Sequence, residues 1–225
     1  TIGYSLDSGR QPFALEEHVF VDVQKAADAG TSLEVRLACL LHDLGKPQAD
    51  RDGRSHAAVG AEIADRILKR LRYPTRVRHH VVRIVADHAF SLDGAFDELC
   101  ARRFLAEHGD GLAADLISHK TADLAAKQVP AHELEWVAKM REMVVRESTQ
   151  PHRIADLAVT GDDLRLIGFD EGPELGRVLQ ALLGLAGRDD HLLQLLRRNG
   201  PGRRQRPERE QGQPPPAARR SVGQH

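Results

Sequence analysis

Histidine and aspartate side chains form the clearest candidate for chemistry in this sequence, at His42-Asp43 in the segment LLHDLGKP. The pair follows an apolar stretch with helical spacing and precedes Gly45, which favours a sharp turn. An imidazole and a carboxylate at the buried end of a helix suit Mn²⁺, Fe²⁺, Co²⁺, Ni²⁺ or Zn²⁺, and Mg²⁺ is tolerated. Alternatively, His42 and Asp43 satisfy the last carbonyls of the helix and the loop that follows. The pair alone leaves both interpretations open.

Two further residues lie on other segments with helical periodicity. His18 precedes the pair within EEHVF, and Asp123 follows it within KTADLA, where its neighbours are apolar. Taken singly, His18 is typical of a surface histidine, and Asp123 is typical of a capping or salt-bridging carboxylate. In order, the chain carries His, His-Asp and Asp on three separate expected helices.

The elements that must position these residues are helices throughout. Apolar residues recur at intervals of three and four, Thr31 or Ser32 caps the second helix, and Pro74 opens another. The segment 45–47 is expected to end the second helix, and 48–55 is expected to be a polar loop. No segment shows convincing strand alternation, so the sequence predicts an all-α fold. The other expected helices cover 15–28, 56–70, 74–88, 95–107, 112–127, 131–147, 162–167, 173–185 and 190–198.

The order His…His-Asp…Asp is the signature of the HD superfamily of metal-dependent phosphohydrolases. Four segments resemble, more specifically, the HD domain of bacterial tRNA nucleotidyltransferases, the CCA-adding members of the poly(A) polymerase family: 42–47 (HDLGKP), 55–61 (SHAAVGA), 68–74 (LKRLRYP) and 82–88 (VRIVADH). Residues 156–179 are similar to the helical part that follows the HD domain there, and the whole resemblance covers 11–198. It implies an HD-type helical bundle followed by a smaller helical domain, with a leader at 1–14, an HD domain at 15–127 and an RNA-binding-like domain at 128–198.

The resemblance implies a divalent metal ion (Mn, Ni, Co, Fe or Mg) as the cofactor, held by His18, His42, Asp43 and Asp123. Asp43 is expected also to orient the attacking water. Lys46 is expected to meet the substrate phosphate, although a lysine just past a helix end is equally typical of a charge partner for that end. His56 and His88 are candidate ligands for a second ion. Alternatively, His56 merely opens one helix and His88 closes another.

The implied activity is that of a metal-dependent phosphohydrolase acting on a phosphomonoester, a cyclic phosphodiester or an RNA-end phosphate. The alternative is a non-catalytic tRNA-binding body of a CCA-adding enzyme. Nucleotidyl transfer in that family needs an α/β head with a Gly-Ser motif and paired carboxylates on a strand, and Asp7-Ser8-Gly9 is not followed by such a strand. We therefore do not expect this chain alone to add CCA. In the alternative function, the nucleotidyltransferase head lies on a separate chain or upstream of Thr1.

The charge of the chain is nearly balanced, with 32 basic and 33 acidic residues and a net charge of −1. Bulk attraction to nucleic acid is therefore excluded, and contact with tRNA or another RNA needs a local patch. Residues 69–83 contain six lysines and arginines and no acidic residue. Arg72, Arg76 and Arg83 are the expected RNA-binding residues, unless they belong to an ordinary solvated helix face.

The last segment, 199–225, is rich in arginine and proline and is expected to be disordered, because it holds too few apolar residues to form a core. Cys39 and Cys100 lie in amphipathic segments and suit a reducing compartment better than a disulfide framework. No apolar run approaches the roughly 18 residues that span a bilayer. These features favour a cytoplasmic protein without a membrane partner.

Overall fold

Short polar side chains at helix starts define several of the elements. Ser32 Oγ accepts a hydrogen bond from the Val35 N–H at 3.2 Å, and the Asp97 carboxylate accepts one from the Cys100 N–H at 2.7 Å. Thr160 caps a later helix through a reciprocal capping box. These contacts satisfy amide groups that the first turn of a helix leaves without partners.

The computed structural model describes residues 4–5, 14–92 and 94–186. Within these ranges every regular element is helical, apart from an isolated bridge between Ser5 and Ala14, and the prediction of an all-α fold is confirmed. The helices are α1 (Leu15–Asp28), α2 (Leu33–Leu41), α3 (Lys46–Asp52), α4 (His56–Arg70), α5 (Thr75–Asp87), α6 (Glu98–His108), α7 (Asp110–Ala125), α8 (Ala131–Glu147), the 3₁₀ turn η1 (Ile154–Asp156), α9 (Gly161–Leu166) and α10 (Pro173–Ala186).

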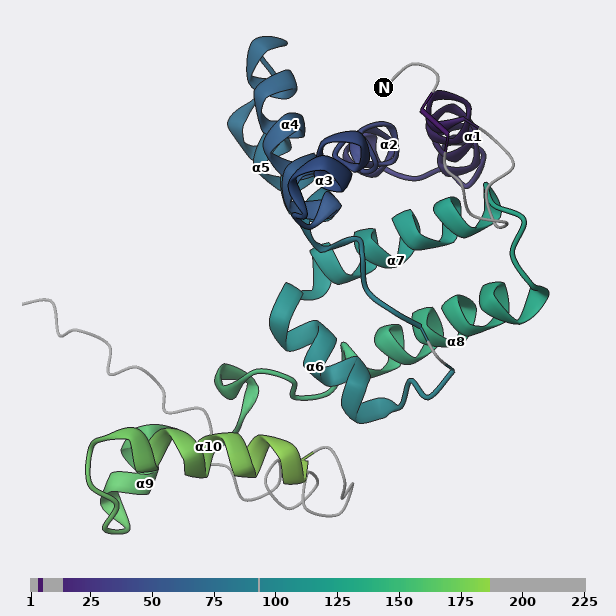
Figure 1. The fold of residues 1–225 in the computed structure, drawn as a ribbon. Coiled ribbons are helices and arrows are strands. Elements are labelled where there is room, and N and C mark those ends of the chain that lie inside the picture. Colours follow the sequence, from purple (N-terminus) through teal and green to yellow (C-terminus); the bar gives the residue numbers. More distant parts are fainter. Residues whose placement is uncertain (1–3, 6–13, 93, 187–225) are drawn as a thin grey trace, which may run out of the picture.

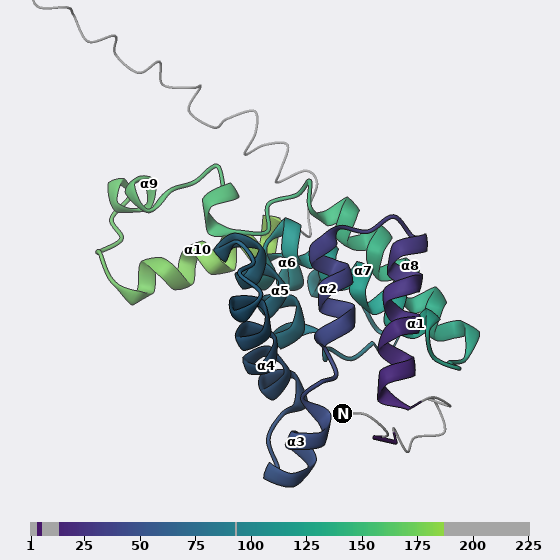
Figure 2. The ribbon, with the colours of Figure 1, turned by 90° about the horizontal axis from the view of Figure 1, so that it is seen from above.

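Helix α7 lies between the α1–α2 pair and α8 (Figure 1). One hydrophobic core includes the fully buried side chains of Leu68 and Ile84 from the α4–α5 pair, which packs side by side in Figure 2. A second core includes Leu105 and Met140 and joins α6, α7 and α8. Burial of each such side chain contributes about 1.5–3 kcal/mol. Because α7 contributes to both cores, the position of Asp123 on that helix is firmly set.

The segment after α2 differs from the sequence-based expectation. The second helix ends at Leu41, before the predicted stop at 45–47, and the predicted loop at 48–55 is wrong because residues 46–52 form α3. Pro47 lies in the first turn of α3, where its missing N–H costs nothing. Gly53 ends α3 in the left-handed conformation, with a φ of 65°. Lys46 is therefore the first residue of a helix.

Helix α8 packs against α6 and α7, so the predicted boundary at residue 127 does not coincide with a break in packing. Beyond it, η1 and α9 both contact α10. The predicted helix at 190–198, the tail at 199–225 and most of the leader at 1–14 lie outside the described residues. In the described part of the chain, no helix combines the length and the apolar character needed to cross a membrane.

Candidate metal centre

A close approach of two backbones holds the end of α2 against the start of α4. A Cβ atom at Gly45 would lie 2.2 Å from the His56 carbonyl oxygen and 2.4 Å from the Gly60 amide nitrogen. The Gly45 dihedral angles are ordinary right-handed helical values, so glycine is needed here for space and not for its conformational freedom. The contact fixes the turn at 42–45 that carries His42 and Asp43.

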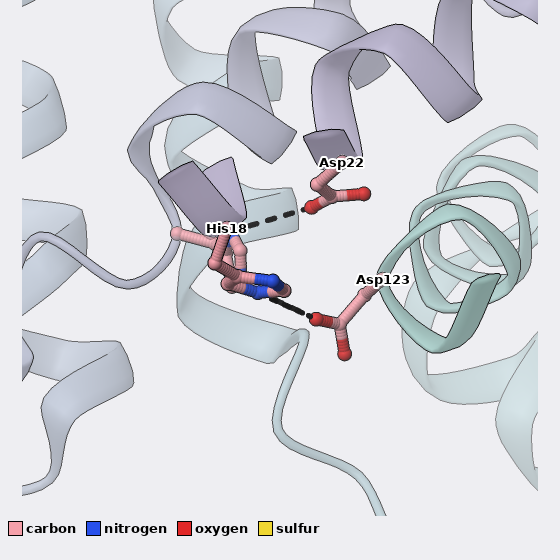
Figure 3. Close-up of side chains that lie close together, drawn as sticks. His18, Asp22 and Asp123 are labelled. Atoms are coloured by element: carbon pink, nitrogen blue, oxygen red, sulfur yellow. Dashed lines mark ion pairs between the residues drawn. The ribbon is translucent and has the colours of Figure 1, made fainter. Parts of the chain in front are cut away.

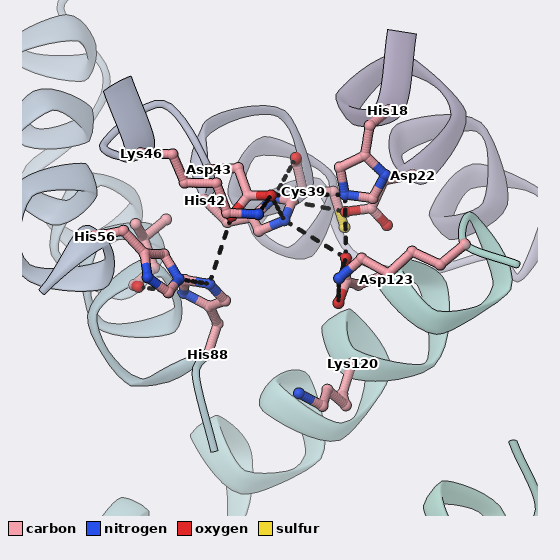
Figure 4. A network of polar contacts seen from close by, with 12 residues as sticks. His18, Asp22, Cys39, His42, Asp43, Lys46, His56, His88, Lys120 and Asp123 are labelled. Carbon is pink, nitrogen blue, oxygen red and sulfur yellow. Dashed lines mark hydrogen bonds and ion pairs between the residues drawn. The ribbon is translucent and has the colours of Figure 1, made fainter. Parts of the chain in front are cut away.

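The four predicted ligands, His18, His42, Asp43 and Asp123, meet in one buried cluster (Figure 4). His42 Nε2 lies 3.2 Å from Asp43 Oδ2 and 3.6 Å from Asp123 Oδ1. His18 Nε2 lies 3.2 Å from the same Asp123 oxygen and 3.7 Å from Asp43 Oδ2. At most 4% of any of the four residues is exposed. We call this set the metal cluster, because His18, His42 and Asp123 share one group of donor atoms that could hold a metal ion, and His42 and Asp43 share another.

Two lysines contact the carboxylates of the metal cluster. Lys46 Nζ lies 2.6 Å from Asp43 Oδ2, and Lys127 Nζ lies 2.6 Å from the Asp123 carboxylate. Both ammonium groups are partly exposed and line the pocket that opens from the cluster. They neutralise carboxylates that would otherwise be costly buried anions.

Mutual charge shifts the pKa values of the cluster. Burial alone would lower the pKa of His42, but the negative charges of Asp43 and Asp123 outweigh burial and raise that pKa to about 10. Burial alone would raise the pKa values of Asp43 and Asp123, but neighbouring histidines and lysines hold both pKa values well below the usual range. The carboxylates therefore stay ionised, and the cluster attracts positive charge.

Asp22 and His119 extend the metal cluster, although the sequence analysis did not single them out. Asp22 and Asp123 both lie beside His18 (Figure 3), and Asp22 Oδ2 is 3.7 Å from His42 Nδ1. The His119 ring centroid lies 4.9 Å from that of His42. Asp22 and His119 are fully buried, and neither ring nitrogen of His119 has a hydrogen-bond partner among the described residues. Each lies four residues from a predicted ligand on the same helix, and this spacing is the signal that could have revealed them.

His56 and His88 lie on one side of the metal cluster. Their Nε2 atoms are 3.3 Å apart, and His88 Nε2 is 4.0 Å from Asp43 Oδ1. Burial lowers the pKa of His88 to about 3 and also lowers the pKa of His56, so both rings are neutral and able to ligate. His56 also opens α4, and His88 directly follows α5, as the alternative interpretation holds. A second ion here stays a prediction.

The donor set fits a divalent ion. Among the described residues, three groups of side chains each place one donor atom per residue within 4.8 Å of one another. The first holds His18, Asp22, His42 and Asp123, the second Asp22, Cys39 and His119, and the third His42, Asp43 and His88. Mixed imidazole and carboxylate ligands suit Mn²⁺, Fe²⁺, Co²⁺, Ni²⁺ or Zn²⁺. Asp22 is fully buried and lies near the Cys39 thiol and the His42 ring, and a bound cation would give its carboxylate a further partner.

The predicted RNA-binding arginines lie apart from this site. Arg72, Arg76 and Arg83 are exposed, and none of them lines the pocket at the metal cluster. Arg76 lies 3.6 Å from Glu34, and Arg83 lies 3.2 Å from Asp87. Acidic residues from outside the segment 69–83 thus offset part of its positive charge.

A pocket of about 450 Å³ opens from the metal cluster. Its lining comes from several parts of the chain: His42, Asp43 and Lys46 after α2, the histidines His56 and His88, residues 89–92 after α5, and side chains from α7, α8 and the connection between them. The volume lies in the range of small-molecule sites. The pocket therefore has room for a small molecule beside the cluster.

The helices of this bundle place His18, His42-Asp43 and Asp123 in one buried cluster beside an open pocket. This arrangement is typical of a helical metal-binding domain. The chain belongs to the HD domain family, whose model matches residues 16–158. The match begins within α1 and extends through α8, so it includes every helix that contributes to the metal cluster and its pocket.

Within this family the chain is similar to tRNA nucleotidyltransferases. It is 37% identical over 161 residues to the CC-adding tRNA nucleotidyltransferase of Thermus thermophilus and 32% identical over 162 residues to the A-adding tRNA nucleotidyltransferase of Deinococcus radiodurans. Each match covers 67% of this chain but only 35% and 37% of the relative. A shorter match, 35% identical over 83 residues, covers 35% of this chain and 20% of the multifunctional CCA protein of Azoarcus sp.. The predicted resemblance is confirmed, and the chain spans about a third of the length of the first two relatives.

Proposed function

We propose that this chain is a metal-dependent phosphohydrolase that acts on a phosphomonoester, a cyclic phosphodiester or an RNA-end phosphate. One observation carries the proposal: a buried set of imidazoles and carboxylates lies at a pocket that also presents lysine ammonium groups. The first feature suits a divalent cation, and the second suits a phosphate.

His18, His42, Asp43 and Asp123 would hold a divalent ion, which would supply Lewis acidity and lower the pKa of a bound water. The side chains of this chain contribute the remaining parts of the reaction. Asp43 accepts a hydrogen bond from the attacking water and so orients it toward the phosphorus atom. Lys46, which lies 2.6 Å from Asp43, donates to a phosphate oxygen and so helps to hold the substrate beside Asp43.

Hydrolysis of simple phosphoesters tests this function. The full chain is stripped of metal with a chelator, and Mn²⁺, Ni²⁺, Co²⁺ or Mg²⁺ is returned before bis-p-nitrophenyl phosphate or 2′,3′-cyclic AMP is added. We expect turnover only after an ion is returned. Asp43→Asn keeps the size of the side chain and should reduce kcat by roughly 100-fold or more. Lys46→Met should mainly raise KM, whereas Lys25→Met, an exposed lysine on α1, should change neither constant.

A non-catalytic tRNA-binding body is the second candidate function. It is favoured by the similarity to tRNA nucleotidyltransferases and by the exposed arginines of the segment 69–83. In this case the metal would only join α1, α2 and α7. Full metal occupancy and tRNA binding, without turnover of monoester, diester or cyclic substrates, would establish this alternative and refute the phosphohydrolase.

A further inference from the structure

A second set of polar side chains lies deeper in the bundle than the metal cluster. Helices α1, α2 and α7 pack against one another, and each contributes one residue to this set: Asp22, Cys39 and His119. All three are fully buried, and none of them lines the pocket at the metal cluster. The hydrolytic chemistry described above does not use them. We call these three residues the inner site.

The spacing along the three helices explains why the inner site forms. Each of its residues lies three or four positions from a member of the metal cluster, on the same helix or at its end: Asp22 from His18, Cys39 from His42 and His119 from Asp123. Residues at this spacing occupy neighbouring turns of one helix face. The packing that gathers the metal cluster therefore also gathers a second set of donor atoms. Figure 4 shows two of its members, Asp22 and Cys39, beside each other next to the metal cluster.

The donor atoms of the inner site are close enough to surround one ion. An oxygen of Asp22, the sulfur of Cys39 and a ring nitrogen of His119 all lie within 4.8 Å of one another. Around a tetrahedral zinc ion, with bonds of roughly 2.0–2.3 Å, such donor atoms are about 3.3–3.8 Å apart. The donors therefore have to approach one another by no more than about 1.5 Å, and rotation of the side chains covers this difference.

His119 is the member of the inner site that a hydrogen-bond network does not explain. The Cys39 thiol donates a hydrogen bond to the Asp22 carboxylate, so these two side chains have each other as partners. The His119 ring is fully buried, and neither of its nitrogens has a hydrogen-bond partner among the described residues. Buried polar groups nearly always have a partner. A cation bound to one of the ring nitrogens would supply it.

We propose that Asp22, Cys39 and His119 form a structural zinc site in the interior of the bundle, one turn deeper than the metal cluster. A thiolate ligand selects Zn²⁺ over Mg²⁺ and Mn²⁺, which prefer oxygen ligands. The thiolate and the carboxylate together balance the two charges of the ion, so the occupied site is neutral and suited to burial. An ion bound there ties α1, α2 and α7 together and so supports the helices that carry the metal cluster. This inference does not depend on hydrolysis.

Cobalt absorption tests the thiolate ligand without any substitution. A bond between Co²⁺ and a thiolate absorbs strongly in the near ultraviolet, whereas Co²⁺ held by nitrogen and oxygen alone does not. The full chain is stripped of metal with a chelator, kept reduced and titrated first with Co²⁺ and then with Zn²⁺. We expect a near-ultraviolet band that levels off at about one thiolate-bound ion per chain and disappears when Zn²⁺ replaces Co²⁺. A chain that binds Co²⁺ without this band would overturn the proposal.

Variants of similar size assign the band to the inner site. Cys39→Ser should abolish the band, and His119→Gln should weaken the binding of the thiolate-bound Co²⁺ by roughly tenfold or more. Cys100→Ser changes the other cysteine of the chain, which lies on α6, and serves as the matched control. It should leave the band unchanged. Asp22 is kept in every variant, because its carboxylate also lies among the donors of the metal cluster.

A variant of the metal cluster separates the two sites. Asp43 is not among the donors of the inner site, so Asp43→Asn should lower the total metal content and keep the cobalt–thiolate band. In this variant Zn²⁺ should still raise the midpoint of urea denaturation, because it binds the folded chain. A band that survives in Cys39→Ser, or that is lost in Cys100→Ser or in folded Asp43→Asn, would contradict a zinc site at Asp22, Cys39 and His119.

Discussion

His42 lies at the centre of the electrostatics of this site. Its ring lies close to two ionised carboxylates, and their charges raise its pKa to about 10 despite its burial. Near neutral pH the ring is therefore an imidazolium that occupies the place of a cation among the carboxylates. A divalent ion must replace this proton, because a ligating imidazole has to be neutral.

Metal binding is therefore predicted to release about one proton per ion near pH 7. Because the proton and the ion compete for the same nitrogen, the affinity for the ion should rise as the pH increases toward the pKa of His42 and level off above it. Calorimetric titration of Mn²⁺ in buffers with different ionisation enthalpies measures the number of protons released. A value of zero, together with a pH-independent affinity, would show that His42 is not a ligand.

Conservative substitution of the ligands is predicted to remove the metal without removing the fold. His42→Gln and Asp43→Asn keep the approximate size of the buried side chains, so they avoid the cavity and most of the unpaired charge that alanine would leave. Each should lower the metal content of the purified chain at least tenfold, measured by elemental analysis. His79→Gln, on an exposed part of α5, is the matched control. Full metal content in folded His42→Gln or Asp43→Asn would refute the assignment.

The sequence indicated only part of this cluster. The motif HDLGKP and the order His…His-Asp…Asp pointed to His18, His42, Asp43 and Asp123, and the structure brings these four together. Asp22 and His119 were not predicted, because a buried polar residue on a helix cannot be told from an exposed one until the packing of that helix is known. Their spacing of four residues from His18 and Asp123 becomes informative only when both helices face the same interior.

At the scale of elements, the turn between α2 and α3 depends on close packing against α4. Gly45 and Gly60 face each other there, and a Cβ at Gly60 would lie 2.8 Å from the His42 carbonyl oxygen. The backbone φ angle is not positive at either glycine. The small residues are thus required because two main chains touch, and this contact determines where α2 delivers its two ligands.

Gly45→Ala is predicted to destabilise the fold by about 1–3 kcal/mol or more, because the new methyl group meets rigid backbone atoms. The same change should weaken metal binding, since the turn that carries His42 and Asp43 has to shift. Gly111→Ala, at an open position in the first turn of α7, should leave stability unchanged or raise it by up to about 1 kcal/mol. Urea denaturation of both variants gives the comparison, and similar midpoints would contradict the role of close packing.

Helix boundaries were predictable where apolar residues repeat, and not where they do not. The predicted helices at 15–28, 56–70 and 131–147 coincide with α1, α4 and α8. Helix α3 was predicted as a loop because its sequence, KPQADRD, has no apolar periodicity and only Ala49 is buried. The helix begins at Lys46 and has a proline, Pro47, near its first position. Such a proline is only a weak signal of a helix start when the residues that follow are polar.

At the scale of the whole molecule, the exposed arginines are separate from the pocket and can act independently of it. If they follow an RNA backbone, the affinity for tRNA should fall linearly with salt on a double-logarithmic plot. Charge reversal of three arginines, Arg72, Arg76 and Arg83, should weaken binding and flatten this slope without changing the metal content. Reversal of an equally exposed set serves as the control: Arg51, Arg54 and Arg66. Equal affinity for tRNA in the two triple variants would show that the segment 69–83 is an ordinary solvated helix face.

In the proposed function, a metal ion in this cluster makes the chain a hydrolase, and one plot tests this role of the metal most directly. Turnover of 2′,3′-cyclic AMP is measured on the chelated chain while Mn²⁺ is added in steps, and bound metal per chain is measured in the same samples. We predict that turnover starts near zero, rises in proportion to bound metal and stops rising when the cluster is filled. Turnover that is already present in the metal-free chain, or that stays absent when the cluster is full, would contradict the proposed metal-dependent hydrolysis.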